Sequence, residues 1–225
     1  MTNSATSALE RMSARDRLLA AADELFYAEG IHSVGIDRVI EHAGVAKASL
    51  YSTFGSKEAL IGAYLDARSE RLQQRLNTAV ESQQEPREKI LSIFDAQEEL
   101  ARRRDFRGCA FVAASAEAPA GGLVEQATRK YRTYLRSLFT TLATDAGARD
   151  AATLACQLHS LYDGSAVAAR LDRSPDSAAS TRAAAAALVD ASSLGQATPP
   201  SAEPGASPRW TGTPTSDPYS VHDPS

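Results

Sequence analysis

Between residues 13 and 191, apolar residues recur with the spacing of helices that bury one face. The clearest series follows i, i+3, i+4, i+7, i+8 and consists of Leu18, Ala21, Ala22, Leu25 and Phe26. Ser13 is a suitable N-cap for this helix, and Gly30 can end it in a left-handed turn. No stretch alternates convincingly with a period of two. The pattern therefore predicts an all-α protein.

The same periodicity predicts more helices downstream. Gly44 stops one short helix, and Leu50 and Phe54 indicate a second. Ser56 can cap a long helix, and Pro86 suits the first turn of the helix after it. Later helices are expected at 109–117, 123–145, 149–171 and 177–191. Altogether we expect about nine helices and no internal repeat.

The most informative segment is 35–58, GIDRVIEHAGVAKASLYSTFGSKE. Gly44 supplies a sharp turn between two short helices, and Val45 can fill the space between them. The positions expected to face inward are 36, 39, 40, 45, 50 and 54. This is a helix-turn-helix pattern, in which one helix braces a second that can enter the DNA major groove. The outer side of the second helix is small, polar and free of carboxylates, as contact with phosphates and bases requires.

Three blocks of sequence carry a resemblance to a known family: LLAAADELFYAEG, AGVAKASLYSTF and SKEAL. With them, residues 12–72 resemble the DNA-binding domain of the tetracycline-repressor (TetR) family of bacterial transcriptional regulators. Across 73–191 the resemblance is supported by helix number and by the segments RGCAFVAASAEAP and LHSLYDGSAVAARLD. It implies a homodimer whose C-terminal helices form the subunit interface and enclose an effector pocket.

DNA contacts are expected on and around the second short helix. Lys47 would contact a phosphate or a guanine edge, with an ordinary solvated lysine as the alternative. The Tyr51 hydroxyl would contact a phosphate, while its ring could pack in the core, and both can hold together. Lys57 could bind phosphate together with the amides of the following helix. Gly35 stands where the family often has Ser or Thr, so it caps a helix without offering a hydroxyl. The expected DNA-binding residues are Gly35, Arg38, Lys47, Ala48, Ser49, Tyr51, Ser52, Thr53 and Lys57.

An effector pocket of apolar or mixed character is expected between the long helices, although the same residues could form the core. Its expected lining is Phe94, Cys109, Phe111, Tyr131, Leu138, His159 and Tyr162. Cys109 is interpreted as an inert buried thiol, with a redox-sensing thiol as the alternative. The Arg102–Arg104 run with Arg107 is interpreted as a solvated turn, with contact to an anionic effector as the alternative.

Two further features of the C-terminal half have competing interpretations. Cys156, His159 and Asp163 could supply half of a metal site, but a core or pocket histidine is the preferred interpretation. Dimerisation is expected through Leu154, Leu158 and Leu161 with the alanine-rich 183–187 face, which could pack across a two-fold axis.

Composition narrows the class of protein further. The 225 residues carry a net charge of −4, and residues 1–60 contain six basic and eight acidic side chains, which is unusual for a DNA-binding module. Segment 42–57, however, contains two lysines and no acidic residue. No secretory signal or membrane-length apolar run is present, and two cysteines make no disulfide framework. We therefore expect a cytoplasmic protein that has no membrane partner.

Seven of the ten prolines lie in the last 34 residues, where Ser, Thr, Gly and Ala also dominate. The expected organisation is a flexible arm at 1–11, a DNA-binding domain at 12–72 with its helix-turn-helix at 35–54, an effector-binding and dimerisation domain at 73–191, and a disordered tail at 192–225.

The expected function is a ligand-responsive repressor that binds a palindromic operator as a homodimer. The expected partners are double-stranded DNA, a second copy of the chain and an unidentified small-molecule effector. No phosphate-binding loop, nucleophile elbow or catalytic triad is found, so catalytic residues, cofactor and metal are all expected to be absent. The alternatives are a helical enzyme using Cys109, His159 or Tyr162, and a DNA-binding or scaffold protein without an effector.

Overall fold

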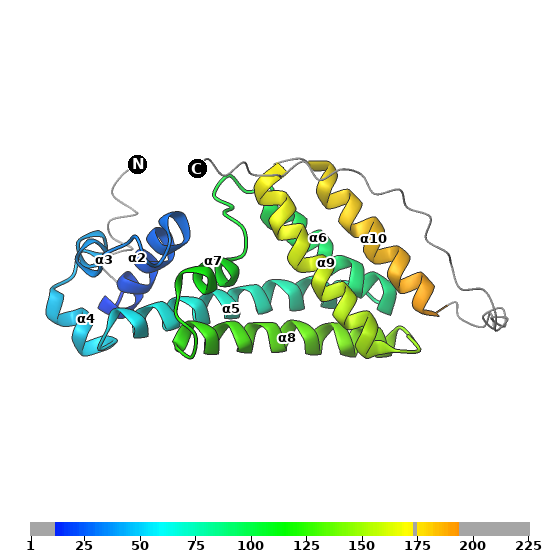
Figure 1. Cartoon of the computed structure of the whole chain (residues 1–225), viewed down its shortest axis with the longest axis horizontal. Helices are drawn as coiled ribbons and strands as arrows, with labels where there is room; N and C mark the ends of the chain where they lie inside the picture. The colour runs from blue at the N-terminus through cyan, green and yellow to red at the C-terminus, as the bar shows by residue number, and fades with distance from the viewer. Residues whose placement is uncertain (1–11, 173–174, 194–225) are drawn as a thin grey trace, which may run out of the picture. The chain divides into compact units, whose positions relative to one another are not determined.

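The computed structural model describes residues 12–172 and 175–193. Within these ranges it contains nine helices and no strand, which confirms the all-α prediction (Figure 1). The helices are α2 (Ala14–Glu29), α3 (Ile36–Ala43), α4 (Lys47–Thr53), α5 (Lys57–Glu81), α6 (Pro86–Ala101), α7 (Ala110–Glu117), α8 (Leu123–Asp145), α9 (Ala151–Asp172) and α10 (Pro175–Ser193). The expected arm at 1–11 and the tail beyond Ser193 lie outside the described residues.

The helix ends follow local signals in the sequence. The Ser13 hydroxyl accepts a hydrogen bond from the Asp16 backbone N–H at 3.1 Å, and Ser56 caps α5 in the same way. Gly44 ends α3 in the left-handed conformation, with φ +61° and ψ +41°.

Gly30 ends α2 differently from the expected left-handed turn. Its φ is +95° but its ψ is +154°, an extended conformation that is almost restricted to glycine. The space beside it is also occupied, because an added Cβ would lie 2.5 Å from Oε1 of Glu117. The chain therefore leaves α2 in an extended path against the end of α7.

The first three described helices, α2 to α4, pack around a small apolar core. Leu18, Phe26, Val39 and Leu50 are all buried there. The long helix α5 joins this core to the rest of the chain, and the Phe26 and Tyr64 rings meet edge to face at 5.6 Å. The domain boundary expected at 72/73 falls inside α5, which continues without a break to Glu81.

Helices α5, α6, α8, α9 and α10 form the larger bundle. In Figure 1, α5 and α8 run side by side, and α9 and α10 lie together across them. Phe94, Phe139 and Tyr162 meet in its centre, with ring centroids 6.0–6.3 Å apart. None of the described helices is long and apolar enough to span a membrane.

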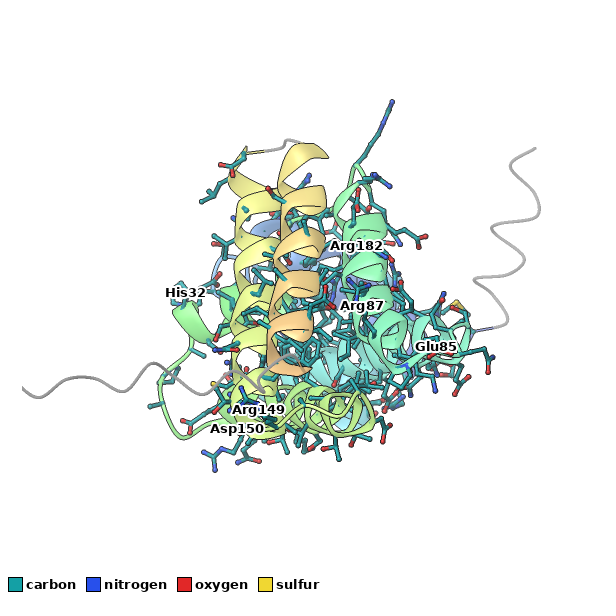
Figure 2. All side chains as sticks on the ribbon, turned by 90° about the vertical axis from the view of Figure 1, so that its right-hand side faces the viewer. His32, Glu85, Arg87, Arg149, Asp150 and Arg182 are labelled. Atoms are coloured by element: carbon teal, nitrogen blue, oxygen red, sulfur yellow. The ribbon has the colours of Figure 1, made fainter. Side chains whose placement is uncertain are left out.

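Ion pairs attach α10 to α6. Arg87 of α6 binds both carboxylate oxygens of Asp190 at 2.7 and 3.0 Å, and Arg182 of α10 binds Asp95 at 2.8 Å. Figure 2 labels both arginines beside these two helices. Bidentate arginine pairs of this kind orient α10 on the bundle.

Candidate functional site

The turn between α3 and α4 is held from both sides. The Val45 N–H donates to the Ile40 carbonyl at 3.3 Å, and the Arg17 guanidinium of α2 donates to the Gly44 carbonyl at 3.3 Å. Leu50 is completely buried on the inner side of α4. One face of α4 is therefore fixed against α2 and α3, as in a helix-turn-helix.

The opposite face of α4 is exposed and carries no carboxylate. Lys47, Ala48, Ser52 and Thr53 are exposed, and Ser49 is half-buried. Tyr51 is 48% exposed, so its ring is not packed in the core. The Ser52 hydroxyl donates to the Ser49 carbonyl at 3.1 Å and keeps its lone pairs available.

Two of the cations expected to contact DNA are paired with carboxylates of neighbouring residues. Lys47 Nζ lies 2.8 Å from Asp37 Oδ1, and this hydrogen bond raises the lysine pKa. Arg38 binds both carboxylate oxygens of Glu29, which raises the arginine pKa. All four side chains are largely exposed, and such surface pairs contribute little free energy, so a phosphate can replace the carboxylate.

The start of α5 offers less to a phosphate than the sequence suggested. Lys57 is its first residue and is half-buried. Glu58 already occupies the helix N-terminus, where hydrogen bonds from its own backbone N–H and from Ser56 lower its carboxyl pKa. At α3, Gly35 is the N-cap and makes no side-chain hydrogen bond, as expected.

A cavity of about 310 Å³ lies among α2, α5, α6, α7, α8 and α9. Phe111 and Tyr131 form one wall as parallel rings with centroids 4.0 Å apart. Of the residues expected to line a pocket, the cavity contains Cys109, Phe111, Tyr131 and Tyr162. The main further lining residues are Asp23, Tyr27, Arg68, Arg71, Leu72, Arg75, Gln97, Leu100, Arg103, Asp105, Asp163 and Ala166.

Three residues expected in the pocket do not line this cavity. Phe94 is buried in the aromatic centre of the bundle, and Leu138 packs against the core from outside. His159 is buried beside Arg136, and its Nε2 has no hydrogen-bond partner; burial lowers its pKa. All three lie on the apolar faces of the long helices. The spacing of apolar residues predicts such a face, but it does not tell a core position from a position in a cavity wall.

Most arginines and aspartates of the cavity are not predicted from the sequence: Arg103 is noted only as part of the 102–104 run, and Asp163 only as a possible metal ligand. Arg68 and Arg71 of α5 both bind the Asp23 carboxylate of α2, at 2.7 and 2.6 Å. Arg103 binds Asp105 at 2.9 Å. The available signal was the spacing 68, 71, 75, which places three arginines on the same helix face as Leu72.

The cavity wall includes a joint between α2 and the larger bundle. The Tyr27 hydroxyl donates to the Gly108 carbonyl and accepts from the Arg107 N–H, both at 2.9 Å. The Arg68 guanidinium lies 3.5 Å from the centre of the Tyr27 ring. A ligand in the cavity would therefore lie next to groups that position the helix-turn-helix.

The structure gives little support to a redox-sensing or metal-binding role for the cysteines and His159. Burial raises the pKa of the Cys109 thiol, which keeps it protonated and poorly nucleophilic. Cys156 is exposed whereas His159 is buried, although they lie on the same helix. Across residues 12–172 and 175–193, no three His, Cys, Asp or Glu side chains lie together as metal ligands would.

The expected dimer interface needs a correction on α9. Leu154 and Leu158 are buried within this chain, and Leu161 is half-buried, so the two buried leucines have no surface to offer a partner. The exposed row on α9 instead consists of Thr153, Cys156, Gln157, Ser160, Gly164, Val167 and Leu171. Helix α10 adds an exposed row of small residues, namely Ser180, Ala183, Ala184, Ala187 and Ala191. The two helices lie side by side in both views (Figures 1 and 2).

Comparison with known proteins agrees with this architecture. Residues 18–64 match the family model described as bacterial regulatory proteins, tetR family. The crystal structure of SCO4454, a TetR-family transcriptional regulator from Streptomyces coelicolor, aligns with a TM-score of 0.77 and 33% identity, over 86% of this chain and 96% of that one. The chain belongs to the TetR family.

Other relatives extend the comparison. The structure of a putative TetR transcriptional regulator from Streptomyces avermitilis is 30% identical, with a TM-score of 0.70 over 80% of this chain and 98% of that one. The HTH-type transcriptional activator FasR from Mycolicibacterium smegmatis is 36% identical over 91 residues. That match covers 39% of this chain and 42% of FasR, so it spans less than half of either protein. These relatives are described as transcriptional regulators, and none as an enzyme.

Proposed function

We propose that this TetR-family protein binds a palindromic operator as a homodimer and that a small molecule in the cavity releases it. The observation that supports DNA binding most strongly is the outer face of α4, which is exposed and has no carboxylate while Leu50 fixes its inner face. DNA carries one phosphate charge per strand every ~3.4 Å, so a protein surface that approaches it must avoid acidic side chains.

Each expected contact has a specific role in this proposal. Lys47 leaves Asp37 to bind a phosphate or a guanine edge, and Arg38 similarly leaves Glu29. The Tyr51 hydroxyl and Lys57 bind phosphates. The remaining expected contacts are small, so the backbone can approach the groove closely and the hydroxyls can reach it. They are Gly35, Ala48, Ser49, Ser52 and Thr53.

Dimerisation through α9 and α10 would pair two α4 helices with two half-sites. The exposed rows on these helices are mostly small or apolar, and the exposed charged residues next to them on α9 and α10 are Arg170, Asp172 and Asp190. A surface of this kind is typical of a subunit interface, and an obligate interface buries more than ~2,000 Å². We expect light scattering to report a dimer at micromolar concentration, and Gly164→Arg to convert it to a monomer. A wild-type protein that is monomeric while binding a palindrome tightly would contradict this part of the proposal.

Effector release follows from the position of the cavity. Its wall contains Asp23 and Tyr27 of α2, and a ligand that favours another arrangement of these residues lowers operator affinity by its differential affinity for the two states. We propose repression as the outcome, because release from the operator then switches a gene on. FasR is described as an activator, so a reporter gene placed behind the operator must separate the two outcomes.

The DNA-binding proposal is tested with a palindromic duplex selected from a random library and a scrambled duplex of equal composition. We expect Lys47→Ala with Tyr51→Ala to weaken operator binding by at least tenfold and to reduce the salt dependence by about one unit per lost phosphate contact per subunit. Lys130→Ala, an exposed lysine on α8, is the matched control and is expected to change neither. Unchanged operator affinity in the double variant would refute the assignment of α4.

A further inference from the structure

The cavity is lined by more arginines than aspartates. Each of its three aspartates is already bound by an arginine, since Asp163 is paired at 2.7 Å with Arg132 from outside the lining. Arg75 also lines the cavity, and within the part of the chain that the structure describes it has no ion pair, hydrogen bond or ring contact. The cavity therefore contains a guanidinium without a counter-ion.

Arg75 lies on α5, one turn after Arg71. It is half-buried and lines the cavity. Removing a cation from water without a compensating anion is costly. Arg75 is also close enough to Tyr162 to act on its hydroxyl, where it opposes the rise in pKa that burial causes.

Two polar side chains that line the same cavity also make no side-chain hydrogen bond within the described part of the chain. Gln97 of α6 is only 7% exposed, and its side-chain amide makes no hydrogen bond to any described residue. The amide atoms keep some accessible surface, and Gln97 is one of the residues that line the cavity. The Tyr162 hydroxyl is in the same situation. Two donors without a protein partner among the described residues therefore line the same cavity as Arg75, where both can donate to a ligand acceptor.

The rest of the wall is apolar. The stacked Phe111 and Tyr131 rings form a flat surface, and Leu72, Leu100 and Ala166 complete it. We propose that the ligand of this cavity is an organic anion, a carboxylate on an apolar or aromatic body, bound by Arg75 with hydrogen bonds from the Gln97 amide and the Tyr162 hydroxyl. This inference rests on the proposed function, because it takes the cavity as the effector site.

The test compares acids with their neutral amides, which have almost the same shape. Benzoate and benzamide, 2-naphthoate and 2-naphthamide, and octanoate and octanamide are titrated into the full chain by calorimetry, without DNA. At least one acid is expected to bind ten or more times tighter than its amide. Arg75→Gln is expected to weaken acid binding by about 10- to 100-fold, as loss of a charged hydrogen bond does, and to leave amide binding unchanged.

Control variants distinguish a direct contact between Arg75 and the acid from a general effect of charge and from misfolding. Arg102→Gln removes an equal charge near the cavity from an arginine that does not line it, and is expected to keep the acid preference. Arg75→Lys keeps the charge and should retain part of the preference, while Gln97→Leu and Tyr162→Phe should each reduce it severalfold. Thermal unfolding of every variant verifies that it is folded.

Two results would overturn the inference: no acid binding more tightly than its amide, or an acid preference that survives Arg75→Gln. Neither result affects operator binding, which is measured separately with the selected duplex. Conversely, an Arg75-dependent acid that leaves operator affinity unchanged supports the ligand class and refutes effector release. The two proposals can therefore fail independently.

Discussion

Lys47 and Arg68 each pair with an aspartate from another helix, at 2.8 and 2.7 Å, but the two pairs lie in different surroundings. The side chains of Lys47 and Asp37 are 59% and 76% exposed, whereas those of Arg68 and Asp23 are 21% and 29% exposed. An exposed pair contributes little free energy and exchanges partners easily, but a half-buried pair is screened less and holds its geometry. The charges of the helix-turn-helix region are therefore free to exchange partners, whereas those of the cavity region join α2 to α5.

The largest expected effect concerns packing in the bundle. Phe94→Ala removes a buried ring from the aromatic centre and is expected to lower the free energy of unfolding by about 3–5 kcal/mol. Phe111→Ala is expected to lower it by less, because Phe111 borders an existing cavity, and to change ligand binding instead. Urea unfolding and ligand titration check both. Equal losses of stability, with no separate loss of ligand binding, would make Phe111 an ordinary core residue.

The next effect concerns the connection between the two regions. Gly30→Ala places a Cβ against Glu117 at a positive φ, and we expect a loss of about 1–3 kcal/mol in unfolding free energy. Gly35→Ala is the matched control, because Gly35 has ordinary backbone angles and open space around it. Because Gly35 is the N-cap of α3, where alanine is a poorer cap than glycine, we expect the control to lose less than about 1 kcal/mol. Similar unfolding midpoints for the two variants would show that the packing of Glu117 on Gly30 contributes nothing.

A smaller effect concerns pH, where a buried and an exposed histidine can be compared. Burial lowers the pKa of His159, although Asp163 opposes this and Arg132 and Arg136 add to it. The imidazole then binds a proton more readily in the unfolded chain than in the folded one. Its contribution to the free energy of unfolding is therefore complete above the ordinary histidine pKa of ~6.5 and is lost as pH falls below that value. We expect His159→Gln to flatten this part of the stability profile. The same change at His42, which is exposed on α3, is the control.

The smallest expected effect concerns the surface pair on the helix-turn-helix. Asp37→Asn removes the carboxylate that competes with phosphate for Lys47, so operator affinity is expected to rise a few-fold. The free energy of unfolding should not change measurably, because the pair is exposed. Fluorescence anisotropy at two salt concentrations measures the affinity. A marked loss of stability would show that the Lys47–Asp37 pair, like the Arg68–Asp23 pair, holds two helices together.

Sequence reasoning succeeded where structure depends on local interactions. Ser13, Gly44 and Ser56 act at helix ends through bonds to residues a few positions away, so their effects can be deduced from a short segment. It failed where a helix face has more than one neighbour. Leu154 and Phe94 were assigned to an interface and a pocket, but both lie in the core, because apolar spacing identifies a buried face without identifying what buries it.

The sequence by itself determined the helices, their ends and the helix-turn-helix, since these depend on periodicity and on bonds within a few residues. Only the tertiary structure decided the composition of the cavity. It places Asp23, Arg75 and Gln97, from three helices, around one cavity, and the side chains of the last two make no hydrogen bond or ion pair with any described residue. The reason is physical: an arginine on a helix is solvated, paired or unpaired according to what the other helices place beside it, and that depends on contacts between residues far apart in the chain.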